Sequence, residues 1–161
     1  MSGRRSLALA LLGAALVAGC GALGPSPPGP LAHVRALPEA SLAPPGSVLI
    51  GTSAQDAQET IDGPQPAIYS RVLGTQEAAT AVETFYADRL PFAGWTPDPY
   101  FIRASIDAWA AAWTKGPVEM SVSILRRGTD PLLPSASMQA RYPTIFQVVL
   151  SAGAGASFPP S

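Results

Sequence analysis

Residues that carry much of protein chemistry are scarce in this chain, which has one cysteine, one histidine and no asparagine among 161 residues. The single cysteine, Cys20, excludes an intramolecular disulfide and a thiolate cluster for a metal ion. His33 is alone and lies in a proline-rich segment, so we expect a solvated imidazole and neither a multi-histidine metal site nor a Ser-His-Asp or Cys-His arrangement. Without asparagine, glycosylation at N-x-S/T is impossible. We therefore expect no enzyme, no metal site and no cofactor.

Charge is also scarce, because only 13% of the residues are Asp, Glu, Lys or Arg and the formal net charge is −1. No stripe of lysine and arginine runs through the folded part of the sequence, and such a stripe is the usual footprint of a nucleic-acid binder. The same lack removes any obvious electrostatic attraction to anionic lipid. The composition therefore predicts no nucleic-acid partner.

What the sequence does have is a distinctive beginning, from Arg4 to Cys20. Two arginines precede an uncharged apolar run over residues 7–18, and small residues follow it. That order is typical of a secretory signal peptide. A run of 12 residues is too short for a membrane-spanning helix, which needs about 20.

The end of this segment, Val17-Ala18-Gly19-Cys20, resembles the lipobox of bacterial lipoproteins, with valine where leucine is usual. The resemblance implies cleavage between Gly19 and Cys20, a lipid on Cys20, and an extracytoplasmic protein anchored to the membrane. Residues 1–19 would then be the signal peptide, and the mature chain would keep eight of ten basic and all eleven acidic residues, a net charge of −3. An uncleaved anchor and an ordinary cleaved signal are the alternatives.

Proline content suggests the boundaries of the remaining chain. Residues 20–46 hold seven prolines and predict an extended, solvated tether behind the lipidated cysteine. Residues 47–153 are long enough for one small domain, and residues 154–161 read as a flexible tail.

Within the domain, apolar β-type runs predict strands over residues 47–53 and 67–73. A helix is expected over 75–90, with Thr75 as N-cap and Pro91 at its end. Its apolar residues share one face: Ala78, Val82, Phe85, Tyr86 and Leu90. The pattern formed by Phe85, Tyr86, Leu90, Gly94 and Trp95 also resembles a helix-then-turn pattern in many small bacterial envelope proteins with α+β domains, most of them without an assigned activity.

Residues 101–115 fit either a helix capped by Ser105 or a strand from about Ile106. The strand is favoured because residues 115–117 form a hairpin turn into a clear alternating strand over 118–125. Residues 129–143 read as a long loop, and 144–152 as the last strand. The order predicts an α+β domain: an antiparallel sheet with one main amphipathic helix packed on one face.

A sheet covered on one face leaves the other open, and aromatic side chains there would form a binding surface. The candidates are Tyr100, Phe101, Trp109 and Trp113. We therefore expect a non-catalytic interaction or structural module with an envelope protein as partner.

The alternative is a receptor for a small molecule or lipid, with a cavity between helix and sheet lined by Phe85, Trp95 and Trp109. An enzyme would have to rely on carboxylates whose convergence the sequence does not show: Asp98, Asp107 and Glu119.

Overall fold

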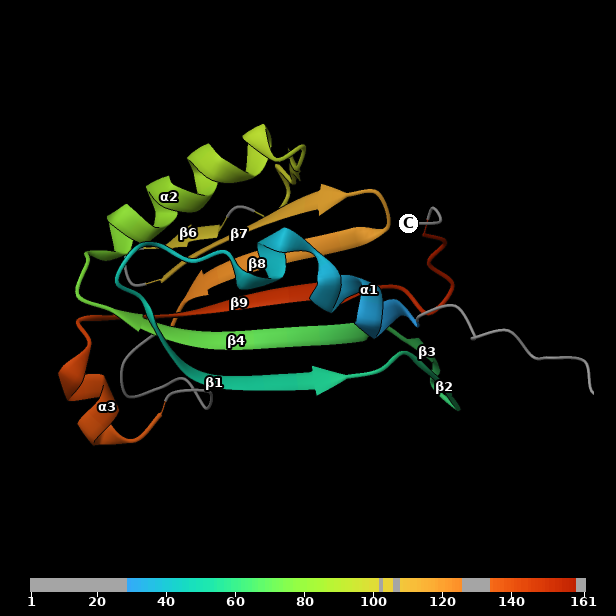
Figure 1. Ribbon diagram of the computed structural model, residues 1–161, viewed down its shortest axis with the longest axis horizontal. Helices are drawn as coiled ribbons and strands as arrows, with labels where there is room; N and C mark the ends of the chain where they lie inside the picture. The colour runs from blue at the N-terminus through green and yellow to red at the C-terminus, as the bar shows by residue number, and fades with distance from the viewer. Residues whose placement is uncertain (1–28, 102, 106–107, 126–133, 159–161) are drawn as a thin grey trace, which may run out of the picture.

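The computed structural model describes residues 29–101, 103–105, 108–125 and 134–158. An antiparallel sheet dominates it, with strand order β1-β4-β9-β8-β7-β5 and with β6 also paired to β7 (Figure 1). Its strands are β1 (Val48–Gln55), β4 (Ala67–Thr75), β5 (Thr96–Pro97), β6 (Arg103–Ser105), β7 (Ala108–Lys115), β8 (Val118–Ile124) and β9 (Thr144–Ala152). A separate hairpin joins β2 (Gln58–Thr60) to β3 (Gly63–Gln65). The helices are α1 (Pro30–Ala36), the 3-10 turn η1 (Pro38–Ser41), α2 (Ala79–Phe92) and α3 (Ala136–Arg141). The expectation of an antiparallel sheet with helices is confirmed.

The last strand of the chain, β9, lies in the middle of the sheet between β4 and β8. Its side chains alternate, and Phe146, Val148 and Leu150 are fully buried on one face. The strands predicted over 118–125 and 144–152 are confirmed, as is a strand rather than a helix in β7. The pair β1–β4 and the strands β8, β7 and β5 are therefore joined into one sheet only by the C-terminal strand β9.

Helix α2 packs on the face of the sheet that carries Phe146, called here the helix face. Val82, Tyr86 and Leu90 supply its buried stripe, in one cluster with Leu73 of β4. The helix begins later than predicted, because Thr75 belongs to β4 and Ala78 is the N-cap without a side-chain hydrogen bond.

The end of α2 is fixed by a Schellman motif. Pro91 lies inside the last turn rather than after it. The N–H of Trp95 donates to the carbonyl of Leu90 at 3.0 Å, and the N–H of Gly94 donates to Pro91 at 3.0 Å. Gly94 has φ +83°, a conformation that favours glycine. Trp95 is thereby carried into the core, as the sequence predicted.

The segment predicted as a solvated tether is folded from Pro30 onward, so that part of the prediction is wrong. Helix α1 lies across β4 and β9 on the helix face, and η1 follows it (Figure 1). Val34 is 0% exposed. Proline did not prevent a helix here because Pro30 and Pro38 occupy the first turns, where no backbone donor is needed.

The predicted flexible tail also packs in part. The Phe158 ring stacks on His33 with centroids 4.2 Å apart, so His33 is not simply solvated. Ala156 and Phe158 pack against the main core cluster. Residues 156–158 therefore lie beside α1 and the core and do not extend freely into solvent.

A smaller cluster lies on the opposite face of the sheet, under α3. Helix α3 falls within the residues predicted as a long loop. The cluster contains Ile50, Val72, Leu125, Met138, Tyr142 and Ile145. The opposite face is therefore covered at this end.

Gly74 provides a test of that packing, because a Cβ there would lie 2.5 Å from Cγ of Tyr142. We predict that Gly74→Ala lowers the free energy of unfolding by about 1–3 kcal/mol through overpacking. Gly51→Ala in β1 is the matched control, because nothing lies within 4 Å of a Cβ at Gly51. Urea denaturation measures both, and equal effects of the two substitutions would contradict the packing.

Candidate functional site

The two tryptophans of β7 face the core, which corrects their predicted place on an open surface. Trp113 is 3% exposed and belongs to the core cluster under α2. Trp109 is half-buried, packs against the same cluster, and its ring lies 6.3 Å from that of Trp113. The alternation correctly placed the two rings on one side of the strand, but the largest apolar side chains face the covered side.

The other predicted binding residues lie at the surface. Tyr100 is 94% exposed and Phe101 is 37% exposed, in the loop after β5. Their binding role stays a prediction. Gly19 and Cys20 lie outside the described residues, so lipidation also stays a prediction.

The described part of the chain holds no group of three or more His, Cys, Asp and Glu side chains that could bind a metal ion. Asp98 accepts a hydrogen bond from the backbone N–H of Tyr100 at 2.9 Å, and Glu119 is exposed on β8. Asp107 lies outside the described residues. The side chains expected to line a cavity, Phe85, Trp95 and Trp109, are all part of the core packing.

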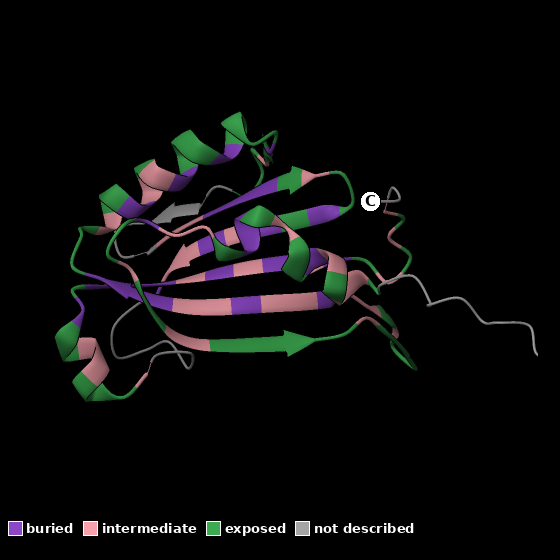
Figure 2. Cartoon of the chain, viewed as in Figure 1, coloured by how far each residue is buried: buried purple, intermediate pink, exposed green. Residues whose placement is uncertain are grey.

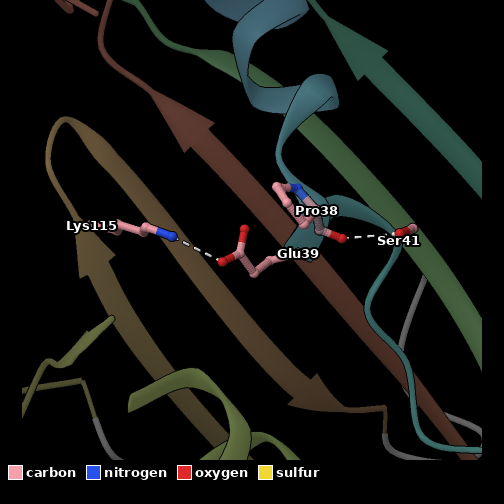
Figure 3. Close-up of polar contacts among 4 residues, drawn as sticks. All are labelled: Pro38, Glu39, Ser41 and Lys115. Carbon is pink, nitrogen blue, oxygen red and sulfur yellow. Dashed lines mark hydrogen bonds and ion pairs between the residues drawn. The ribbon is translucent and has the colours of Figure 1, made fainter. Parts of the chain in front are cut away.

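The polar cluster that the sequence did not reveal centres on Glu39, at the first turn of η1. Glu39 is nine-tenths buried, and Lys115 Nζ at the end of β7 donates to its Oε1 at 2.9 Å (Figure 3). The other oxygen, Oε2, is buried, and no group in the described part of the chain donates a hydrogen bond to it; nor does the buried Nε1 of Trp95 have an acceptor there. Lys115 Nζ also lies 5.8 Å from the Trp95 ring centroid. The cluster is thus a buried carboxylate with one strong partner.

Two opposing effects set the pKa of Glu39. Burial raises it, but the hydrogen bond from Lys115, the nearby N–H groups of the Glu39 backbone and the Trp95 indole, and the charge of Lys115 together outweigh burial. The pKa therefore lies below its ordinary value, and Glu39 is ionised in the folded protein at neutral pH.

Two further side chains hold the backbone next to Glu39. Arg71 Nη1 from β4 donates to the carbonyls of Ala40 at 3.0 Å and Leu42 at 3.3 Å. The hydroxyl of Tyr86 donates to Leu42 at 3.0 Å, and burial raises the pKa of this hydroxyl even though Arg71 lowers it. Tyr86 therefore remains a neutral donor at physiological pH, and α2, β4 and β7 each hold the η1 segment.

A pocket of about 340 Å³ adjoins this cluster between η1 and the C-terminal end of α2. It is shallow and open to solvent. Its lining is Pro38, Glu39, Leu42, Arg89, Phe92 and Ala93. Arg89 lies 5.5 Å over the Phe85 ring and Phe92 is 93% exposed, so the outer wall presents a cation and an apolar ring.

Comparison of the chain with family models, curated proteins and solved structures finds no match. Among the described residues, no helix combines the length and apolar character needed to cross a membrane. The site therefore has to be interpreted from its own residues.

The lowered pKa of Glu39 predicts acid sensitivity. Because the unfolded carboxyl binds a proton more readily than the folded one, this contribution to stability is present above the ordinary glutamate pKa and is lost as the pH falls through the lower, folded value. We predict that the melting temperature of the wild type falls more steeply between pH 7 and pH 3 than that of Glu39→Gln.

The matched control is Glu119→Gln, at an exposed position, which should follow the wild-type profile. Burial raises the pKa of Glu83 and acts in the opposite sense, so the difference between wild type and Glu39→Gln is the quantity to compare. Parallel profiles for wild type and Glu39→Gln would show that the ion pair does not stabilise the fold.

Proposed function

We propose that this chain is a lipid-anchored protein of the cell envelope whose domain acts as a non-catalytic interaction module at the membrane surface. The observation that carries the proposal is the sequence Val17-Ala18-Gly19-Cys20 followed, after nine residues, by a folded domain. A lipid on Cys20 would be the membrane anchor.

The short connection between Cys20 and the domain limits how far an anchored domain can lie from the membrane. Residues 21–29 reach at most about 30 Å when fully extended, at roughly 3.3–3.6 Å per residue. An anchored domain would therefore stay within about its own diameter of the membrane. Partners that it meets would lie in the same membrane or on its surface.

The exposed aromatic side chains of Phe92, Tyr100 and Phe101 support contact with a protein partner, because aromatic residues are enriched in binding hot spots. The sequence had already suggested Tyr100 and Phe101 as contact residues, and the structure adds Phe92. Trp113 is excluded because its side chain is buried.

Binding of a small molecule is the second candidate, favoured by the pocket beside Glu39. Its volume of about 340 Å³ lies at the lower end of the range for ligand sites. Arg89 would supply a cation and Leu42 apolar contact. We rank it second because the pocket is shallow.

The anchor can be tested by replacing Cys20. We predict that the wild-type chain fractionates with membranes and has a mass above that of residues 20–161 by the mass of the attached lipid. Cys20→Ser should lose both properties, because serine offers no thiol for the lipid. Ser26→Ala, in the same segment, is the control and should behave as wild type. Unchanged fractionation and mass for Cys20→Ser would contradict the anchor.

A further inference from the structure

Apart from a bulge between Leu49 and Gly51, the outer edge of β1 lacks protection against pairing with another strand. Among the described residues, β1 pairs only with β4, and no strand occupies its other edge. Its eight residues include no charged residue and no proline. Six of the eight are exposed, and Figure 2 shows most of β1 in green. Natural sheets usually block such edges with charges, prolines, bulges or short strands.

The opposite edge of the sheet has those features. It is divided into β5, of two residues, and β6, of three. Pro97 lies in β5, and Arg103 begins β6. The sheet is thus protected along one edge and available along the other.

We propose that the β1 edge pairs with the β1 edge of a second copy of this chain, antiparallel and about a two-fold axis. A bulge between Leu49 and Gly51 limits the regular part of the strand to residues 51–55. Ser53 is the centre of that part, so an antiparallel self-pairing places Ser53 opposite Ser53 of the second copy. Thr52 then faces Ala54, and two small uncharged surfaces meet.

Charge favours the antiparallel arrangement over a parallel one. Asp56, Glu59 and Asp62 follow β1 at its C-terminal end. A parallel pair would bring these acidic groups of the two copies together. In the antiparallel pair, the Asp56 residues lie about 20 Å apart along the strands, at roughly 3.4 Å per residue, which exceeds the screening length at physiological salt.

The position of the N-terminal connection also fits this pairing, a step that rests on the proposed lipid anchor. The described chain begins at Gly29, beside Asp56, and continues into α1 on the helix face. A two-fold axis normal to the sheet keeps α1 of both copies on the same side. The two connections therefore leave toward one membrane, each with a reach of about 30 Å. Shared anchoring raises the effective concentration of a short, weak interface.

Cross-linking of the full chain in membranes tests the pairing. With a short bis-maleimide, we expect Ser53→Cys to give a covalent homodimer, because paired residues of neighbouring strands have Cβ atoms about 5 Å apart. Thr80→Cys, exposed on α2, is the matched control and should give none. Adding Thr52→Lys to Ser53→Cys should reduce the dimer at least fivefold, whereas adding Thr80→Lys should leave it unchanged.

Two results would overturn the proposal. One is a dimer yield for Ser53→Cys no higher than for Thr80→Cys. The other is cross-linking of Ser53→Cys to a different protein, which would assign the edge to a foreign strand. A dimer of the wild-type chain would instead show that Cys20 carries a free thiol. That result would contradict the lipid anchor. The pairing would still be decided by whether Ser53→Cys gives a higher dimer yield than Thr80→Cys.

Discussion

The fold depends on covering one face of a sheet that is six strands wide. At about 4.8 Å between strands, that width is roughly 24 Å, whereas a packed helix covers about 10 Å. Helix α2 reaches Phe146 of β9 through Tyr86, but α2 alone would leave the rest of the apolar face of β4 and β9 in water. The segment Pro30–Ser41 supplies the missing cover, and Val34 and Ala40 are its buried contacts with the core. The N-terminal segment is therefore part of the domain and not a spacer in front of it.

A short segment whose buried apolar side chains are only Val34 and Ala40 needs more than hydrophobic burial to stay in place. Polar groups from three separate elements supply the rest: Lys115 binds Glu39, while Arg71 and Tyr86 donate to the backbone carbonyls beyond it. These donors also satisfy acceptors that would otherwise be buried unpaired. Because Glu39 and Lys115 are 76 residues apart, closing this contact joins the N-terminal segment to the hairpin of β7 and β8.

Local patterns predicted the strands well, because alternation in residues 118–124 and 144–152 specifies both the element and the side chains that share a face. The same pattern does not say which face is covered, and for this reason Trp113 was expected on the open side. Prolines obscured α1, although the three-residue spacing of Leu31, Val34 and Leu37 was a helical signal. No local signal could predict the Glu39–Lys115 contact, which depends on the tertiary arrangement.

The central claim, that residues 30–43 are a structural part of the domain, can be tested most directly by hydrogen–deuterium exchange of the full chain. The backbone N–H groups of Leu37, Ala40 and Leu42 donate to carbonyls within the segment. The account predicts that a peptide covering residues 30–43 exchanges slowly, on the timescale of β4 in the same sample. Complete exchange of that peptide within seconds, while β4 stays protected, would mean that the segment is a solvated tether and would contradict the account.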